Sequence, residues 1–353
     1  MEPDEIILEG GKLIDKGTYG CIFDKPLLCK NKQLPKNKLG KITDTVDANA
    51  EMQAYQILHK IKESKDYFVL PDNVCVPSEN QVDPDTSICL KNLHITNLQS
   101  MKQLSTPYGG ISLSKKSTIP FFVLMKHMLE AGSIMLLNGF VHYDIHNGNI
   151  LVDKFGIPRL IDYGQSFNSK TITIDSIKGR WKELSPRFAT EPPEVTLLTA
   201  MDSINRYTFE EAMQDIMPDK RIFLTIEKLL GVTLKKQLVS LAQFAKQSQA
   251  FQHFDLVKLW KLYYPGFDSW AIGTVLLEYL DRIKYSYEFL ESAEWKLKRV
   301  IVTDILRKML HTNPRERIDC LEALNMLDPF NDIYTKYGVE WLKAKKIQRR
   351  KGA

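Results

Sequence analysis

The chain has 353 residues, of which 44% are hydrophobic and 26% are charged, and its formal net charge is +5. A chain of this length can form two modest domains or one large domain with insertions, and its composition excludes disorder over the whole length. The positive charge comes from one segment: residues 343–351 hold six cations and no acid, which leaves 42 basic and 43 acidic residues elsewhere.

The five cysteines bear on the redox setting of the protein. Their number is odd, they are widely spaced and they form no CxxC pair; they are Cys21, Cys29, Cys75, Cys89 and Cys320. This pattern argues against a disulfide framework or a zinc ribbon and favours a reducing compartment. The chain starts with acidic residues, and no apolar run long enough for a signal peptide or a membrane span follows them. We therefore expect a soluble, intracellular protein.

Residues 11 to about 110 are expected to form short strands and turns around one helix. Glycines punctuate the start of this region, and residues 48–61 have the apolar spacing of a helix. Residues 70–90 contain several prolines, aspartates and asparagines, which indicate an irregular surface loop. The character of the sequence changes after Pro107 and the glycine pair that follows it.

The rest of the chain is expected to be mostly helical. An apolar helix is predicted from 118 to 138, where Gly139 provides a stop, and residues 150–161 have the pattern of a tight hairpin. A polar loop is predicted for 165–187, and helices continue to about residue 328. The basic residues 343–351 have two interpretations: a solvated, frayed C-terminus, or a contact with a polyanion such as nucleic acid, acidic lipid or an import receptor.

The segment from His142 to Asn149 has the residues of a phosphoryl-transfer loop. It places Asp144 five positions before Asn149, and Asp162 follows eighteen positions after Asp144, beyond the predicted hairpin. Phosphoryl transfer needs a carboxylate to orient the attacking hydroxyl and hard oxygen ligands for Mg²⁺. Asp144 suits the first role, and Asn149 and Asp162 suit the second. Single Asp or Asn residues in loops are usually turn formers, so it is the combined spacing that favours catalysis.

These motifs resemble the H-R-D-x-x-x-x-N and D-F-G signatures of eukaryotic-type serine/threonine protein kinases. The resemblance implies an α+β, bilobal protein-kinase-like fold, with a small β-rich N-lobe over 1–106 and a larger α-helical C-lobe over 107–330, followed by a basic tail over 331–353. It also implies ATP and Mg²⁺ as cofactors, Asp144 and His146 as catalytic residues, and Asn149 and Asp162 as metal ligands.

The same resemblance extends to the N-terminal region. The run Lys16–Ile22 looks like the glycine-rich loop over the ATP phosphates, although Asp15 stands where its first glycine is expected. Lys41 and Glu51 look like the lysine and glutamate that form an ion pair in kinases, with Lys30, Lys36 and Lys38 as competing lysines. The residues implied to bind ATP are Gly17, Thr18, Tyr19, Gly20, Ile22, Lys41, Glu51, Leu104 and Thr106, with the hinge near 104–110 holding the adenine.

Three further landmarks belong to protein kinases rather than to small-molecule kinases. Residues 191–194, Glu-Pro-Pro-Glu, look like the A-P-E that closes the activation segment. Asp268 lies in a D-x-W-x-x-G pattern and is implied to brace the backbone of the catalytic loop, and Arg317 is implied to be the buried partner of Glu194. These landmarks favour proteins as substrates.

The sequence departs from the family pattern at three places. Tyr143 replaces the arginine of H-R-D, which predicts activity that does not depend on phosphorylation of the activation segment. His146 replaces the usual lysine, as in aminoglycoside and choline phosphotransferases, and can act as a cation or as a neutral donor. Glu194 and Asp268 are 74 positions apart, which predicts a helical insertion over about 195–267.

A narrower resemblance is carried by short motifs in the first 113 residues, including 17–23, 26–29 and 107–113. They are similar to motifs of the serine/threonine kinases encoded by large nucleocytoplasmic DNA viruses, which implies residence in the host cytoplasm or the virion. The expected function is transfer of the γ-phosphate of ATP to serine or threonine hydroxyls of proteins. A small-molecule phosphotransferase and a pseudokinase scaffold are the alternatives.

Overall fold

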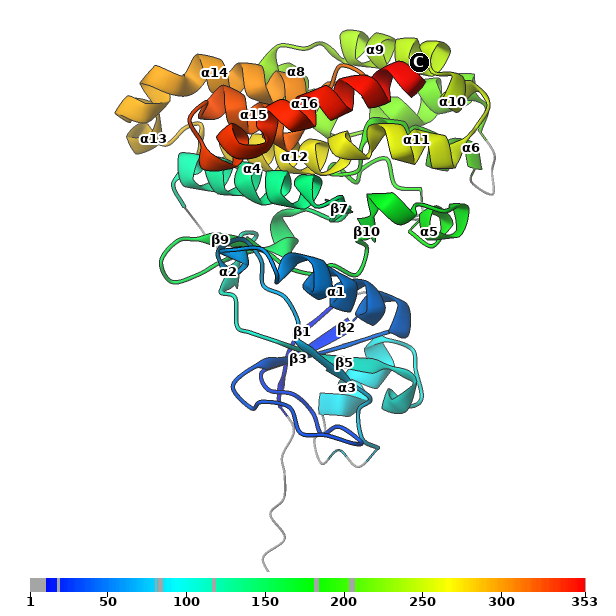
Figure 1. Cartoon of the computed structure of the whole chain (residues 1–353), viewed down its shortest axis with the longest axis vertical. Helices are drawn as coiled ribbons and strands as arrows, with labels where there is room; N and C mark the ends of the chain where they lie inside the picture. Colours follow the sequence, from blue (N-terminus) through cyan, green and yellow to red (C-terminus); the bar gives the residue numbers. More distant parts are fainter. Residues whose placement is uncertain are drawn as a thin grey trace, which may run out of the picture. The chain divides into compact units, whose positions relative to one another are not determined.

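The structure is a computed structural model that describes residues 11–17, 20–79, 81, 85–115, 119–180, 184–202 and 207–352 (Figure 1). Thr18 and Tyr19, two of the residues expected to bind ATP, lie outside the described residues, as does the acidic start of the chain. The chain divides into two compact units. The first comprises the residues up to 111 together with 159–166, and the second comprises 112–158 together with the residues from 167 onward.

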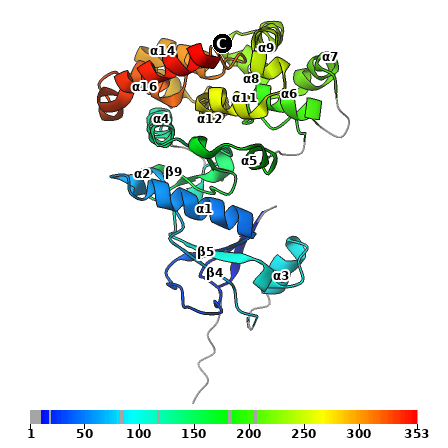
Figure 2. The ribbon, with the colours of Figure 1, turned by 45° about the vertical axis from the view of Figure 1, so that its right-hand side comes forward.

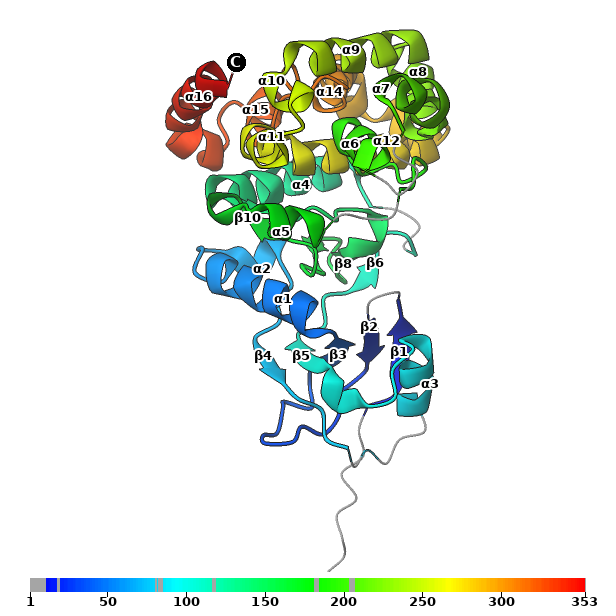
Figure 3. The same cartoon turned by 90° about the vertical axis from the view of Figure 1, so that its right-hand side faces the viewer.

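The first unit is built on a five-stranded antiparallel sheet with the order β1-β2-β3-β5-β4 (Figure 3). The strands are β1 (Leu13–Lys16), β2 (Gly20–Phe23), β3 (Leu39–Thr43), β5 (Lys102–Thr106) and β4 (Asn73–Cys75). The segment 159–166 joins this unit because the Val69 N–H donates to the Leu160 carbonyl at 2.9 Å, beside a parallel bridge from Phe68 to Leu160.

Helix α1 (Thr45–Leu58) is the main helix of the first unit. It begins three residues before the predicted range because Asp44 caps it: its side chain accepts a hydrogen bond from the Asp47 N–H. The helix buries Ala48, Glu51 and residues further along the same face. Two shorter helices, α2 (Ser64–Tyr67) and α3 (Asp85–Asn92), lie in the region predicted to be irregular or just before it.

Four of the five cysteines form disulfides in the first unit, so the prediction of unpaired thiols is wrong for them. Cys21 is bonded to Cys89 and Cys29 to Cys75, with Cα–Cα distances of 5.9 and 6.0 Å. Only Cys320, buried in the second unit, is free among the described residues. Cys21 and Cys89 belong to the apolar core of the first unit, which also contains Phe23, Leu27, Ile42, Leu98 and Met101. The parity and spacing of the cysteines could not reveal pairs created by tertiary folding, and they no longer favour a reducing compartment.

The second unit is mainly helical, and its core lies around α4 (Phe121–Leu137). This helix packs against α12 (Phe267–Ile283) and α15 (Cys320–Leu327), and α14 (Ala293–Met309) packs against both α12 and α15. The unit also holds α5, α6 and α13, at Ile174–Lys178, Pro193–Asp202 and Tyr287–Glu291. Its short strands are β7 (Phe140–Val141), β8 (Ile150–Val152) and β10 (Phe167–Asn168), while β6 (Ile111–Ser112) and β9 (Pro158–Leu160) lie at the unit boundary.

The described residues of 195–267 are mainly helical, as expected. They contain α7 (Phe209–Glu211), α8 (Ile222–Leu230), α9 (Leu234–Gln247), α10 (Gln249–Gln252) and α11 (Leu256–Tyr263). Helix α8 packs against α12, and α9 packs against α8 (Figure 2). A small β-containing N-terminal region and a larger helical C-terminal region are therefore confirmed at the level of an α+β protein. No helix among the described residues is both long and apolar enough to cross a membrane.

The basic C-terminal segment differs from a frayed end. Residues Asp332–Gly352 form helix α16, which contacts α4, α11 and α15 (Figure 1). Lys345 is buried and forms ion pairs with Asp319, at 2.6 Å, and with Glu322. The indole N–H of Trp341 also donates to Asp319, at 2.8 Å. The charge of Lys345 is thus used in ion pairs inside the second unit. The side chains of 348–351 lie outside the described part of the chain.

Candidate active site

Lys41 lies between two carboxylates in the first unit. Its Nζ is 2.6 Å from Glu51 Oε1 and 2.8 Å from Asp162 Oδ1. Strand β3 positions the lysine because it is hydrogen-bonded on both sides, and helix α1 carries Glu51 on its buried face. The structure therefore brings together three residues that the sequence separates by up to 121 positions. Of the competing lysines, Lys38 pairs with Asp72 instead.

Burial and charge oppose each other at this lysine. Burial disfavours the ammonium of Lys41, but the Asp162 and Glu51 carboxylates outweigh that effect and raise its pKa. Burial also raises the pKa of Glu51 to about 7, although the Lys41 charge acts in the other direction. Asp162 has a φ of 65°, in the left-handed region that aspartate tolerates better than most residues. Lys41 is therefore a cation that the carboxylates of Glu51 and Asp162 hold in place, and Asp162 itself has an uncommon backbone conformation.

The register of the sheet places two more of the expected ATP-binding residues beside Lys41. Lys41 is directly opposite Ile22 on β2 and Leu104 on β5. Side chains of directly opposite residues point to the same face of an antiparallel sheet, so Ile22, Lys41 and Leu104 form one row across three strands. Gly20 is required because a Cβ there would lie 2.5 Å from the Ile42 carbonyl oxygen. This steric reason differs from the expected contact with the ATP phosphates. The Gly17 N–H donates to the Gly20 carbonyl at 2.9 Å, which joins the end of β1 to the start of β2.

Asp144 and Asn149 are joined within the second unit. The Asn149 Nδ2 donates to the Asp144 carbonyl at 2.9 Å and to Asp144 Oδ2 at 3.3 Å. Both bonds use the amide nitrogen of Asn149, whereas a metal ion would bind its amide oxygen. The spacing of five residues is thus the spacing that lets one side chain hold both the backbone and the carboxylate of Asp144.

His146 has one ring nitrogen in use as an acceptor. The Gly148 N–H donates to His146 Nδ1 at 3.0 Å, and Nε2 lies 3.9 Å from Asp144 Oδ2. A nitrogen that accepts a hydrogen bond carries no proton, so the ring is in the neutral form with its proton on Nε2, on the side of Asp144. Of the two roles expected for His146, this geometry favours the neutral donor. Gly148 is needed there, because a Cβ would lie 2.6 Å from His146 Cε1.

Asp268 holds the backbone that precedes Asp144. Its two carboxylate oxygens accept hydrogen bonds from the N–H groups of His142, at 2.8 Å, and Tyr143, at 2.9 Å. Burial raises the pKa of Asp268, while the neighbouring His142 opposes the shift. Tyr143 has a φ of 66°, which is uncommon for an aromatic residue. The two bonds explain how this backbone conformation is maintained.

The side chain of Tyr143 lies in an aromatic cluster. Its ring centroid is 5.6 Å from Phe167, 5.8 Å from Phe267 and 6.5 Å from Trp260. Burial raises the pKa of Tyr143 well above its usual value. Phe167 belongs to β10, which pairs with β7 just before residues 142–149. Trp260 comes from the predicted insertion, and no signal in the sequence connected it to residue 143.

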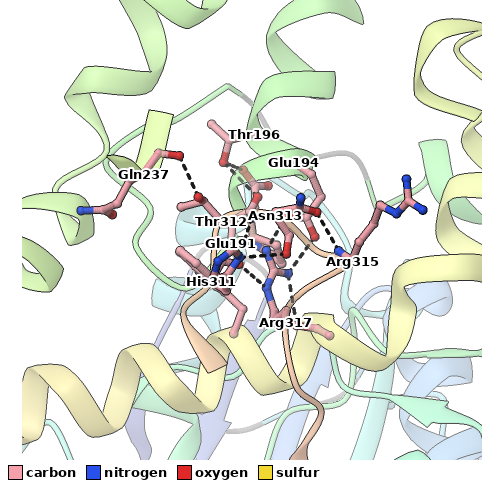
Figure 4. A network of polar contacts seen from close by, with 12 residues as sticks. Glu191, Glu194, Thr196, Gln237, His311, Thr312, Asn313, Arg315 and Arg317 are labelled. Atoms are coloured by element: carbon pink, nitrogen blue, oxygen red, sulfur yellow. Dashed lines mark hydrogen bonds and ion pairs between the residues drawn. The ribbon is translucent and has the colours of Figure 1, made fainter. Parts of the chain in front are cut away.

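Glu194 and Arg317 form the expected buried pair (Figure 4). The contact is bidentate: Nη1 donates to Oε1 at 2.8 Å and Nη2 to Oε2 at 2.7 Å. Arg317 also donates from Nε to the His311 carbonyl at 3.0 Å, and its guanidinium lies 4.9 Å from the centroid of the Trp270 ring. Both partners are buried, so each charge depends on the other.

Lys220 is a buried residue that the sequence analysis missed. Its Nζ donates to the Phe188 carbonyl at 3.1 Å and to Thr196 Oγ1 at 2.9 Å, and that hydroxyl donates to Glu191 Oε2 at 2.6 Å. Burial lowers the pKa of Lys220 to about 8, against the opposite effect of Glu191. A lysine between polar residues gives no sequence signal of burial. It ties the predicted insertion to the end of the predicted activation segment.

The expected site residues therefore form two groups. Lys41, Glu51 and Asp162 are joined in the first unit, and Asp144, His146 and Asn149 are joined in the second. No cluster of three or more His, Cys, Asp or Glu residues among those described could hold a metal ion by itself. No protein-family model matches the chain, and no curated protein matches it significantly.

Proposed function

We propose that this protein is an ATP- and Mg²⁺-dependent protein kinase with a bilobal kinase fold, acting on serine and threonine hydroxyls. The observation that carries the proposal is Lys41, a cation that is only 13% exposed and is fixed by Glu51 and Asp162. An isolated cation in a sheet costs free energy unless carboxylates compensate it. Here the two carboxylates hold an ammonium in one position, which is what contact with the α- and β-phosphates requires.

The row of Ile22, Lys41 and Leu104 supports the same proposal. Ile22, the half-buried apolar member of the row, offers a surface for the adenine ring, while Leu104 is fully buried behind it. The segment after Thr106 offers backbone groups to the adenine edge. The phosphates then lie near the backbone of Gly17 and Gly20, which are joined by a hydrogen bond. In this proposal, the contacts with adenine and the phosphates come from the row across the sheet and from the backbone of Gly17 and Gly20.

In the proposed transfer, the substrate hydroxyl oxygen forms a bond to the γ-phosphorus as the bond from that phosphorus to the β–γ bridging oxygen breaks. ADP leaves with the bridging oxygen, and Asp144 accepts the hydroxyl proton. Asn149 fixes the Asp144 carboxylate through its 3.3 Å hydrogen bond, so that little reorganisation is needed. His146 donates from Nε2 to an oxygen of the transferring phosphoryl group, which partly replaces the usual lysine charge.

The donor set of Asn149 and Asp162 fits Mg²⁺. An amide oxygen and a carboxylate are hard ligands, and Mg²⁺ in kinases takes few protein ligands because waters and phosphate oxygens complete its shell. When bound, the metal would neutralise charge on the phosphates.

Two features favour a protein as the acceptor. The Glu194–Arg317 pair and Lys220 fix residues 188–196, which include the predicted end of the activation segment, a landmark of protein kinases rather than of small-molecule kinases. His146 favours the alternative, a small-molecule phosphotransferase, because that class shares a histidine two positions after its aspartate. The narrower viral resemblance, with residence in the host cytoplasm or the virion, belongs to the proposal as well.

Transfer from γ-labelled ATP separates these functions. The full chain is incubated with Mg²⁺ and either a generic protein substrate or a panel of amino-sugars. We expect label in the protein, none in the sugars, and at least a hundredfold loss in Asp144→Asn. Asp175→Asn changes an exposed acid of α5 in the same way and should retain activity. Label in the sugars alone would establish the alternative, and equal labelling by wild type and Asp144→Asn would remove Asp144 from the mechanism.

A further inference from the structure

The first unit contains a pocket of about 450 Å³ apart from the row that carries Lys41. It is lined by the last turn of α1, by α2 and the chain after it, by residues 107–109 and by Arg159. The lining includes neither Lys41 nor Leu104. Its volume lies within the range of small-molecule sites. The pocket is therefore a second candidate site, beside the one proposed for ATP, and the two share the segment 107–109.

Flat aromatic groups form much of the lining. Tyr55 and His59 stack with ring centroids 4.3 Å apart and an interplanar angle of 9°, and the imidazole Nδ1 contacts the Tyr55 carbonyl. Phe68 is buried beside them, and Tyr108 is 68% exposed although it lines the pocket. Stacked and exposed rings of this kind favour a planar ring as ligand.

Ser64 provides a polar group without a partner. Its residue is 5% exposed, and its buried Oγ makes no hydrogen bond to any described residue. Most buried hydroxyls in proteins are hydrogen-bonded, because an unpartnered one has lost water without compensation. A ligand oxygen that accepts from this hydroxyl would remove that cost.

The charge of the lining is positive. Lys65 and Arg159 are cations, and Lys65 has no ion-pair partner among the described residues. The acid among the described lining residues is Asp72, which pairs with Lys38 and accepts a hydrogen bond from Asn73 Nδ2 at 3.2 Å. Because the charge of Asp72 is already compensated, the pocket favours an anionic ligand.

We propose that this pocket binds a planar aromatic monocarboxylate. The ring would lie against the Tyr55–His59 pair and Tyr108, and the carboxylate would accept from Ser64 and interact with Lys65. The carboxylate distinguishes this class from neutral aromatic compounds, since only the anion uses both the hydroxyl and the cation.

The pocket also has a connection to the proposed ATP site. Tyr55 lies one helical turn after Glu51 on α1, and Pro107 directly follows Thr106. A ligand in the pocket therefore contacts both segments. On the premise of the proposed function, the aromatic acid and ATP change each other's affinity by the same factor.

Calorimetric titration of the full chain with naphthalene-2-carboxylate tests the proposal. Naphthalene-2-carboxamide, which has the same ring and no charge, serves as the comparison. We expect the acid to bind and the amide to bind at least tenfold more weakly. No heat from the acid, or equal affinities for acid and amide, would overturn the proposal.

Three variants locate the binding. Lys65→Glu should remove the preference for the acid, whereas Lys62→Glu, at a side chain that is 92% exposed and outside the lining, should leave it unchanged. Ser64→Ala should weaken the acid severalfold and still fold, because it removes a hydroxyl that has no partner. Unchanged binding in both Lys65→Glu and Ser64→Ala would place the acid elsewhere and overturn the proposal.

Repeating the titration at saturating ATP separates this proposal from the kinase proposal. A change in acid affinity with ATP supports the coupling. If ATP neither binds nor is hydrolysed while the acid still binds with its Lys65 dependence, the kinase proposal fails and the aromatic-acid site stands.

Discussion

The two disulfides of the first unit are expected to provide much of its stability. Cys21–Cys89 and Cys29–Cys75 have sequence separations of 68 and 46 residues. In the chain-entropy description, closing each loop alone would stabilise the folded unit by about 4 kcal/mol. The loops are nested, so with the inner bond closed the outer bond constrains a path of only about 22 residues and contributes about 3 kcal/mol. Removing both should therefore cost about 7 kcal/mol rather than the sum of two independent bonds.

The assay follows the two units separately. All five tryptophans lie beyond residue 180, so tryptophan fluorescence reports on the second unit, while hydrogen exchange of peptides from 20–79 reports on the first. We expect a Cys29→Ser/Cys75→Ser variant to lose protection in the first unit and to keep its fluorescence transition in urea. The double variant Cys21→Ser/Cys89→Ser should lose a similar amount of protection, because either bond contributes about 3 kcal/mol while the other remains closed.

Thiol counting tests the premise directly. In denaturant without reductant, one thiol per chain should react with an alkylating reagent, and five should react after reduction. Cys320 is the expected single site. Five reactive thiols before reduction would refute the disulfide assignment and the reasoning built on it.

Three further predictions concern the second unit. Arg317→Met should lower its free energy of unfolding by roughly 3–5 kcal/mol, because Glu194 remains buried without its partner, and adding Glu194→Gln should restore part of the loss; urea titration by fluorescence measures both. Burial lowers the pKa of Lys220 to about 8 in the folded protein. Between about pH 8 and 10.5 the unfolded chain therefore binds one more proton than the folded protein does. The free energy of unfolding should rise over that range by up to roughly 3 kcal/mol in wild type but not in Lys220→Met. Phosphatase treatment should leave the proposed kinase activity unchanged, because Tyr143 contacts Phe167 through its ring and no phosphate is needed there; a large loss would contradict this.

The sequence could predict the local parts of the candidate site. The intervals around Asp144 and Asn149 lie within one loop, and the structure joins these two residues by hydrogen bonds. The Lys41–Glu51 pair was also predicted, because the family resemblance implies an ion pair between a lysine on a strand and a glutamate on the helix that follows it. Periodicity likewise indicated α1 and α4, whose apolar positions recur at helical spacing.

Contacts between distant segments could not be predicted without the fold. Lys220 and Lys345 are buried because segments distant in the sequence pack around them. Isolated lysines are usually exposed, so the sequence did not indicate this burial. The contact of Trp260 with Tyr143 has the same origin, since α11 and residues 142–149 meet only in the folded unit. The prediction about the cysteines was wrong because it used only their number and spacing. Whether two cysteines pair depends on which Cα atoms come within about 6 Å of each other in the folded chain.

The central claim is that Lys41 positions the phosphates of ATP for transfer to a protein. Its most direct test compares Lys41→Met with Lys38→Met, a neighbouring lysine in the same first unit that also has a carboxylate partner. Phosphate transfer from γ-labelled ATP to a protein substrate is measured for both, with the thermal unfolding of each variant as a control. We predict that Lys41→Met loses at least a hundredfold in kcat/KM while Lys38→Met stays near wild type. Equal activity of the two variants, or no transfer by the wild type, would contradict the account.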